Sequence, residues 1–183
     1  MNTTIKKDLF RFVGNDCNKL FVQMRFIFFT AGFRYTYFYR KAQNAKFIIS
    51  RCFWKFMTRQ CMLRTGIQIP IETKIDEGLR IVHFGHIVIN PEAIIGKNFN
   101  INQGCLIGNA KGKHEGVPTI GNNVFMSANS IIIGNVHIGN DVLIAPGAFI
   151  NFDVPDNSIV IGNPGKIIQR ETSPTEKYIV YAI

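Results

Sequence analysis

The chain lacks the features of a disulfide-bonded or membrane-spanning protein. Its four cysteines form no CxxC pair and are too scattered for a disulfide framework: Cys17, Cys52, Cys61 and Cys105. No apolar run approaches the roughly 20 residues that a bilayer span needs, and no signal peptide with a cleavage pattern is recognisable. These absences predict a protein of the reducing cytoplasm.

Acidic residues are scarce in the first third of the chain. Residues 1–66 contain 13 Lys and Arg against only Asp8 and Asp16, and they hold 15 of the 22 aromatic residues. Residues 67–183 contain 8 basic and 10 acidic residues. Because the composition changes near Gly66, we expect a basic, aromatic-rich N-terminal segment over 1–66 and a different domain after it.

Hydrophobic spacing predicts that the N-terminal segment is mostly helical. Ile5, Leu9 and Phe12 line one face of a first helix, and the Asn15–Asp16 pair is expected to cap the helix that follows. A later helix is expected over 47–62.

The N-terminal segment has two compatible interpretations. It is a helical pad that covers the start of the following domain, or a surface that makes peripheral contact with an anionic membrane at the inner face of the cell. The second interpretation rests on basic residues interleaved with Trp and Phe, which suit an anionic interface. Nucleic acid is not expected as a partner, because no recognition motif accompanies the charge.

An aliphatic residue or Met recurs at every sixth position in the second half of the chain. The regular series is Ile120, Met126, Ile132, Ile138, Ile144 and Ile150. The same phase occurs earlier, at Ile95, Ile101 and Ile107 and more loosely at Ile75, Ile81 and Ile87. A period of six fits neither a helix nor an ordinary strand, and it is the signature of a β-helix solenoid. If three hexads make one coil, equivalent side chains lie 18 residues apart.

The repeat is interrupted once. Between Ile107 and Ile120 the sequence GNAKGKHEGVPT (108–119) is rich in Gly and Lys, which predicts a loop extruded from the solenoid. Loops on rigid scaffolds are common places for function. After the last hexad, turns and a strand are expected up to residue 168, and the tail 169–183 is either a further strand or a helix.

These features resemble the hexapeptide-repeat acyltransferases. The matching segments are GLRIVHFGHIVIN (78–90), AIIGKNFNINQGCLIGN (93–109), PTIGNNVFMSANSIIIGNVHIGNDVLIAPGAFI (118–150) and VPDNSIVIGNPGKII (154–168). Within that superfamily the chain is most similar to the serine acetyltransferase type and its relatives, the O-acetyltransferases of bacterial capsular and exopolysaccharides. The resemblance implies an all-β left-handed parallel β-helix over 67–168, a homotrimer, and acetyl-CoA held in the groove between neighbouring solenoids.

The chain departs from the serine acetyltransferase pattern in three places. Those enzymes carry Asp immediately before the catalytic His and another Asp about 15 residues upstream, where this chain has Val82 and Gln68. Their helical N-terminal domain is also longer. The basic segment with Gly32-Phe33-Arg34-Tyr35 looks more like the polysaccharide-modifying relatives, which favours a sugar hydroxyl as the acceptor.

Acetyl transfer from a thioester to an alcohol needs a base, because an alcohol is a poor nucleophile at neutral pH. Histidine suits this role, since its ordinary pKa is near working pH. The resemblance implies that His83 is the catalytic base and that His114, in the loop, is the second active-site histidine. His86 is a weaker candidate, and His137 is expected to face solvent. Glu72, Glu115 or a backbone carbonyl is expected to orient His83.

The resemblance also implies residues for the two substrates. Ser127 and Ala145 match positions that line the groove for the pantetheine arm, and Lys166 matches a basic residue that meets the nucleotide phosphates. Asn102 and Gln103 are candidates for contact with the acceptor. No metal is expected to take part.

The sequence therefore favours an acetyl-CoA-dependent O-acetyltransferase that acts on a sugar of a bacterial surface polysaccharide or its precursor. The alternative from the same superfamily is a serine O-acetyltransferase of cysteine biosynthesis. Two other classes are less favoured: a metal-dependent carbonic anhydrase, whose histidine spacing does not fit, and a non-catalytic solenoid subunit.

Overall fold

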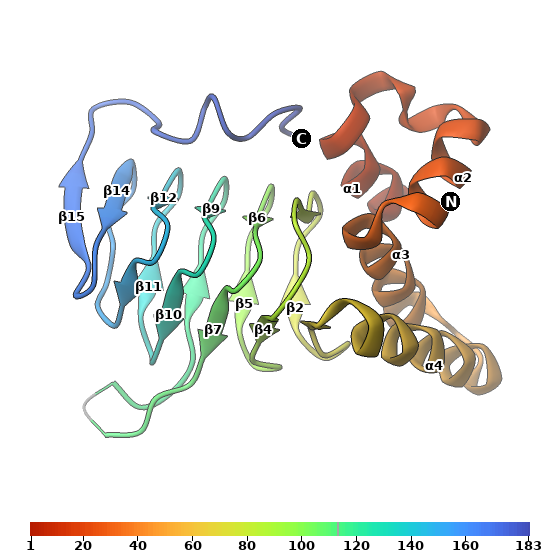
Figure 1. Ribbon diagram of the computed structural model, residues 1–183, viewed down its shortest axis with the longest axis horizontal. Coiled ribbons are helices and arrows are strands. Elements are labelled where there is room, and N and C mark those ends of the chain that lie inside the picture. Colours follow the sequence, from red (N-terminus) through yellow and green to blue (C-terminus); the bar gives the residue numbers. More distant parts are fainter. Residues whose placement is uncertain (113) are drawn as a thin grey trace.

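The computed structural model describes residues 1–112 and 114–183, in which helices precede a rod of short strands (Figure 1). The helices are α1 (Thr3–Val13), the 3₁₀ helix η1 (Gly14–Asn18), α2 (Leu20–Phe29), α3 (Ala31–Asn44) and α4 (Ile48–Thr65). Across the described residues, none of the helices has the length and apolar character needed to cross a membrane.

Parallel sheets form the three sides of the rod. Sheet A contains β1 (Ile67–Gln68), β4 (Ile87–Ile89), β7 (Leu106–Gly108), β10 (Ile131–Ile133) and β13 (Phe149–Ile150). Sheet B contains β2 (Lys74–Ile75), β5 (Ile94–Ile95), β8 (Thr119–Ile120) and β11 (His137–Ile138). Sheet C contains β3 (Arg80–Ile81), β6 (Asn100–Ile101), β9 (Phe125–Met126), β12 (Leu143–Ile144) and β14 (Ser158–Ile161). The chain visits sheets A, B and C in turn, so three strands complete one coil.

One large apolar side chain from each strand points into the rod. In sheet C this inner ladder is fully buried, and it consists of Ile81, Ile101, Met126, Ile144 and Val160. In sheet B, Ile138 pairs with Ile120, 138 − 120 = 18 positions earlier, which confirms the predicted coil of three hexads. Each coil buries its inner side chains against the next coil, so stacking stabilises the rod.

The first coil departs from the six-residue phase. Ile107 pairs with Ile89 and not with Ile87, so the phase expected at Ile87 is wrong. From Ile81 to Ile89 the chain takes 89 − 81 = 8 steps, whereas it takes 107 − 101 = 6 steps from Ile101 to Ile107. The turn that follows β3 is therefore two residues longer than the turn below it.

The rod ends in a hairpin. The strand β15 (Lys166–Gln169) pairs antiparallel with β14, whereas the other paired strands of the described residues run parallel. The solenoid-like winding therefore stops at β14, slightly before the residue 168 that the sequence suggested.

Two buried tyrosines attach α3 to the first coil. The Tyr35 hydroxyl donates to the carbonyl of Ile69 at 2.9 Å, and the Tyr39 hydroxyl donates to the carbonyl of Thr73 at 2.6 Å. Burial raises the pKa of Tyr39 to about 12, because the phenolate would be removed from water. The helices thus cover the start of the rod, as the interpretation of a helical pad expected.

A buried ion pair joins α1, α3 and the first coil. The Arg40 Nε donates to the Asp8 carboxylate at 2.9 Å, and both side chains are almost inaccessible to solvent. The second Asp8 oxygen accepts the backbone N–H groups of Gly78 and Leu79 at 2.8 and 2.9 Å. Because the partners of this carboxylate come from α3 and from the first coil, Asp8 holds the two regions together.

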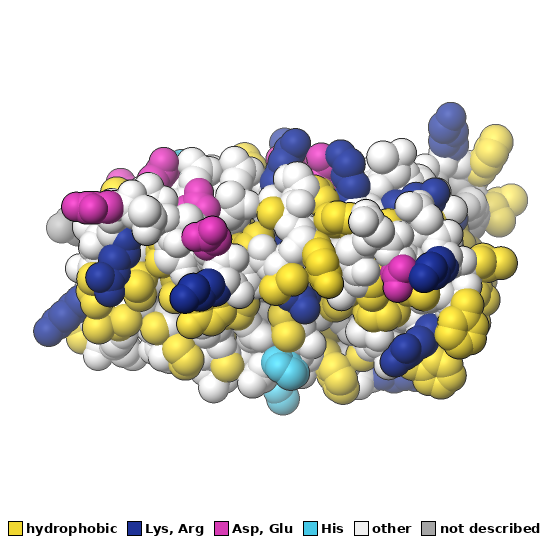
Figure 2. All heavy atoms as spheres, turned by 90° about the horizontal axis from the view of Figure 1, so that it is seen from above, with side chains coloured by type: hydrophobic (Ala, Val, Ile, Leu, Met, Phe, Trp, Pro, Cys, Tyr) yellow, Lys and Arg dark blue, Asp and Glu magenta, His cyan; other side chains and the backbone are white. Residues whose placement is uncertain are grey.

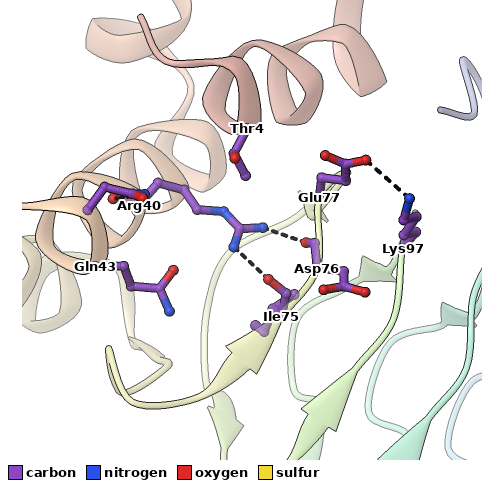
Figure 3. A pocket seen from close by; sticks show the side chains of 8 residues that line it. Thr4, Arg40, Gln43, Ile75, Asp76, Glu77 and Lys97 are labelled. Atoms are coloured by element: carbon purple, nitrogen blue, oxygen red, sulfur yellow. Dashed lines mark hydrogen bonds and ion pairs between the residues drawn. The ribbon is translucent and has the colours of Figure 1, made fainter.

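A cavity of about 430 Å³ lies beside this ion pair (Figure 3). The Arg40 guanidinium reaches from α3 and donates to the carbonyls of Ile75 and Asp76, each at 2.6 Å. On the other side Lys97 lies 3.3 Å from the Glu77 carboxylate. Both cations already have protein partners, so this cavity is part of the joint between helices and rod.

The predicted cap of the second helix is wrong. The Asn15–Asp16 pair lies inside η1, and α2 begins only at Leu20, where no side chain caps it. The chain first closes the tight turn of η1, so these two side chains come too early to reach the N–H groups of α2.

Residues 170–183, here called the strap, run back along the rod from β15 to the helices (Figure 1). The Ser173 hydroxyl donates to Asp141 at 2.7 Å, and the Ile183 N–H donates to the Asn98 side chain at 3.1 Å. Asn98 and Asp141 both adopt positive φ at the edge where sheet B leads to sheet C. The strap therefore follows one edge of the rod, and it is neither of the two elements that the sequence left open.

The far end of the strap is tied to α1. The buried Arg11 guanidinium donates to the carbonyl of Val180 and, at 2.5 Å, to the Asn100 side chain in β6. Burial, reinforced by a neighbouring positive charge, lowers the pKa of Arg11 to about 10. The Tyr178 ring packs on Phe125 of β9 with ring centroids 5.0 Å apart. The strap thus links the helices, sheet C and the last coil.

Candidate functional site

One edge of the rod collects most of the predicted site residues. This C–A edge consists of the turns that leave the sheet C strands and lead to sheet A. The residues that directly follow the paired inner positions Ile81, Ile101, Met126 and Ile144 occupy equivalent places on successive coils. These equivalent residues are Val82, Asn102, Ser127 and Ala145. The register therefore lines up His83, Gln103 and the two predicted pantetheine positions along one edge.

His83 lies in the enlarged turn of this edge, at the first coil. Its side chain is exposed, and so is that of Phe84, at 56%. The turn closes through Gly85, whose φ of +120° strongly favours glycine, and its carbonyl accepts the N–H of Gly104 at 2.9 Å. His86 also has a positive φ of 50°. The two additional residues push the His83 turn outward, and histidine side chains project from one edge near the middle of the molecule (Figure 2).

Phe84 is an exposed aromatic residue beside His83 that the sequence analysis did not single out. It follows His83 directly in the same turn and is more than half exposed, so the turn presents an apolar ring as well as an imidazole. The signal for it was present in the sequence, because the spacing from Ile81 to Ile89 is longer than six. The apparent match of Ile87 to the repeat concealed that signal.

On the coil next to His83, two polar side chains differ in how free they are to contact a substrate. Asn102 is buried, and its side-chain amide donates to the carbonyl of Met126 at 2.8 Å, so this amide bridges two coils. Gln103 is exposed and follows it on the edge. Of these two predicted acceptor contacts, Gln103 has the freer side chain.

Ser127 and Ala145 supply small side chains on the next two coils. Their backbone N–H groups already donate to the carbonyls of Ile144 and Val160, each at 2.9 Å, which fixes the rungs of the ladder. Both residues are only partly buried, so the edge has little side-chain bulk there. Lys166 is exposed at the start of β15, at the end of the rod.

His114 lies on a different edge. The loop that contains it connects β7 of sheet A to β8 of sheet B, and its base is closed by an antiparallel bridge between Ala110 and Gly116. The His114 carbonyl accepts the N–H of Asn135 at 2.9 Å, which anchors the loop on the next coil. Lys113, within the predicted loop 108–119, lies outside the described residues. Within one chain the structure therefore does not bring His83 and His114 to the same edge.

The carboxylates suggested as partners of His83 also lie on the A–B edge. Glu72 is in the turn between β1 and β2, where Lys55 approaches it at 3.9 Å, and Glu115 is in the extruded loop. Over the described part of the chain, we find no hydrogen bond to the His83 imidazole and no group of three or more ligating side chains able to hold a metal. His137 is exposed in β11, as predicted.

The hexad region matches a known family model. Residues 118–151 match the model described as bacterial transferase hexapeptide with six repeats. This match covers the regular coils that contain Ser127 and Ala145.

Curated proteins with similar sequences include serine acetyltransferases. The enzyme of Synechococcus elongatus is 35% identical over 118 residues, which is 63% of this chain and 48% of the relative. Serine acetyltransferase 2 of Arabidopsis thaliana is 37% identical over 106 residues, 57% of this chain and 32% of the relative. The chain thus spans about half or less of the length of these relatives.

Solved structures give the same fold. The serine acetyltransferase of Vibrio cholerae has a TM-score of 0.74 at 23% identity, covering 94% of this chain and 67% of that one. The serine acetyltransferase of Brucella abortus has a TM-score of 0.72 at 22% identity, and the match covers 93% of this chain and 69% of that one. The Neisseria gonorrhoeae enzyme in complex with serine has a TM-score of 0.71 at 24% identity, and the match covers 90% of this chain and 67% of that one.

These comparisons correct one prediction and confirm another. The preference for a sugar hydroxyl of a surface polysaccharide is wrong, because the Synechococcus, Arabidopsis, Brucella and Neisseria proteins are all serine acetyltransferases. That preference rested on the basic N-terminal segment, which does not contain the site edge. The predicted left-handed β-helix with N-terminal helices is confirmed. The chain therefore carries bacterial transferase hexapeptide repeats on the fold of the serine acetyltransferases.

Proposed function

We propose that this chain is an acetyl-CoA-dependent serine O-acetyltransferase. The observation that carries the proposal is the C–A edge, where an exposed His83 on an enlarged turn stands in line with the small residues Ser127 and Ala145. A base next to a groove of low side-chain bulk is what transfer from a long thioester to a small alcohol requires. The similarity to serine acetyltransferases supports serine as the acceptor.

The proposed reaction uses His83 as general base and then as general acid. The imidazole takes the proton of the serine hydroxyl while the hydroxyl oxygen bonds to the thioester carbonyl carbon. The carbon–sulfur bond then breaks, and the CoA sulfur receives the proton held by the imidazolium. The products are O-acetylserine and free CoA, so atoms and charge balance without a metal.

Several groups of the chain support binding of the two substrates. The partly exposed coils at Ser127 and Ala145 let the pantetheine arm approach the backbone, and Lys166 offers a positive charge to the nucleotide phosphates. On the acceptor side, the apolar Phe84 stands in the His83 turn and the polar Gln103 stands in the equivalent turn of the next coil.

We further propose that the working form is a homotrimer whose site is shared between copies. The support is geometric: His83 lies on the C–A edge, whereas His114, Glu72 and Glu115 lie on the A–B edge. Contacts in a cyclic trimer are heterologous, and the proposed arrangement sets the A–B edge of one copy against the C–A edge of the next. Among the described residues of its own chain His83 has no carboxylate partner, and in this arrangement Glu72 or Glu115 of the neighbouring copy is available to it.

The function is tested with the purified full chain, acetyl-CoA and L-serine, by measuring release of the CoA thiol with and without serine. Serine-dependent release is expected. Release that does not depend on serine, or no release at all, would overturn the proposal in favour of another acceptor or a non-catalytic subunit.

The shared site is tested by mixing two inactive variants. His83→Ala and His114→Ala chains are co-expressed, so that random mixing places an intact His83 beside an intact His114 at about a quarter of the interfaces. Recovery of about that fraction of wild-type turnover is expected. No recovery, with trimers present by light scattering, would place both histidines in a site within one chain. Activity of His114→Ala by itself would remove His114 from catalysis.

A further inference from the structure

The helical end of the molecule exposes an unusual amount of apolar side chain. None of the ten residues of α2 is buried, although eight of them are apolar. The exposed fractions of Phe21 and Phe29 are 77% and 85%. At the start of α4, Ile48 and Ile49 are 73% and 82% exposed. Helices of a water-soluble domain normally bury such a face, whereas over the described residues much of this one stays uncovered.

The exposed helices border one groove. A cavity of about 490 Å³ is lined by side chains of α2, α3 and α4, among them Met24, Phe28, Tyr37, Phe38, Phe53 and Trp54. α3 forms the floor of the groove, because both α2 and α4 pack against it. The apolar surface is therefore continuous across α2 and α4.

The segment that forms this apolar surface contains basic but no acidic residues. Residues 17–71 contain no Asp or Glu. The exposed basic residues of α2, α4 and their flanks are Lys19, Arg25, Lys46, Arg51, Lys55, Arg59 and Arg64. Of these, Lys19 pairs with Asp16 and Lys55 lies 3.9 Å from Glu72. On the face seen from above, basic and apolar side chains gather at the helical end, with an acidic side chain among them (Figure 2).

We infer that the α2–α4 surface docks on a membrane leaflet of anionic phospholipid. Large apolar side chains enter the boundary between head groups and acyl chains, while the basic residues around them meet lipid phosphates. A second copy of the same surface fits less well, because it would bring the same positive charges together across the contact. A nucleic acid would satisfy the charge and would leave the exposed aliphatic residues Ile48, Ile49 and Leu20 unburied.

The inference is tested by flotation of the full chain with two kinds of vesicle. One contains phosphatidylglycerol and phosphatidylcholine, and the other contains phosphatidylcholine alone. Binding to the anionic vesicles is expected, with weak binding to neutral ones, and raised salt should release the protein. No flotation with the anionic vesicles, or equal flotation with both kinds, would overturn the inference.

Two double variants locate the contact. Arg51→Gln/Lys55→Gln should lower the vesicle partition coefficient roughly 30-fold, at about a tenfold factor per 1.4 kcal/mol and the usual strength of a basic residue near an anionic surface. Ile48→Ser/Ile49→Ser should lower it about tenfold or more. All four side chains project into solvent, so the fold should persist, and circular dichroism checks this.

Matched controls lie outside the α2–α4 surface, in β15 and the strap. Arg170→Gln/Lys177→Gln removes two exposed charges and Ile167→Ser/Ile168→Ser removes two exposed aliphatic side chains, and neither should change vesicle binding. If the control variants lose as much vesicle binding as the α4 variants, the assignment of the contact to the α2–α4 surface is wrong. A different outcome is that wild-type protein does not bind vesicles and Ile48→Ser/Ile49→Ser lowers the oligomeric state in solution. In that case a second copy is the partner and the inference is wrong.

Discussion

The rod buries its inner apolar residues, whereas helix α2 leaves its apolar residues partly or largely exposed. In the rod, one inner side chain per strand is sealed between neighbouring coils, and Ile138, Ile144 and Ile150 are completely buried. In α2 the apolar residues lie on every side of the helix and none is buried. The contrast teaches that apolar content by itself does not identify a core, because a core also needs a periodicity that matches the geometry of its element.

The largest effect is expected from a charge placed inside the rod. Ile138→Asp should cost about 4 kcal/mol or more of unfolding free energy, because an unpaired carboxylate would be buried between coils. Phe29→Asp in α2 is the matched change at an exposed site, and we expect it to alter stability by about 0.5 kcal/mol or less. Urea unfolding measures both values. Similar losses of unfolding free energy in the two variants would mean that the rod and α2 do not differ in how they bury apolar residues.

Breaking the joint between the regions should have the next largest effect. Asp8→Ala leaves the Arg40 guanidinium buried without its carboxylate, at an expected cost of about 3–5 kcal/mol. Disruption should begin at the helices, so hydrogen exchange should rise in α1 and α3 before it rises in the distant coils. Lys7→Ala, which removes the more exposed pair with Glu77, serves as control and should cost about 1 kcal/mol or less.

The activity of the rod should depend on one turn. His83→Ala should lower kcat/KM for serine acetylation by about 10²–10⁴ while the protein stays folded and oligomeric. His137→Ala removes an exposed histidine from β11 and should leave kcat/KM unchanged. Turnover near the wild-type value in His83→Ala would remove this residue from the mechanism.

The smallest effect is expected at the strap. Tyr178→Ala removes an aromatic pair with Phe125 and should lower the unfolding free energy by about 1 kcal/mol. Thermal melts detect a loss of this size as a shift of a few degrees. Val180→Ala is a control, because its side chain is 42% exposed and the contact to Arg11 uses its backbone carbonyl. An unchanged melting temperature in Tyr178→Ala would mean that the strap adds no stability.

The sequence predicted the site edge only in part. An 18-residue coil brings Ser127 and Ala145 into register, and any solenoid of this period would do so. The placement of His83 relative to His114 did not follow from the repeat, because the two lie on turns between different pairs of sheets. The longer turn that contains Phe84 was not predicted. Ile87 fits the period of six in the sequence, but Ile89 occupies the inner position in the structure.

The hexad spacing by itself determined the rod, because each coil can bury its aliphatic residues only against a neighbouring coil of the same kind. The change of composition near Gly66 likewise marked where the helices end. Only the tertiary structure decided which turn bulges, where the strap lies and that Asp8 and Arg40 form the joint. Those features depend on contacts between residues far apart in the chain, such as Arg11 with Asn100 and Val180, and no local pattern encodes them.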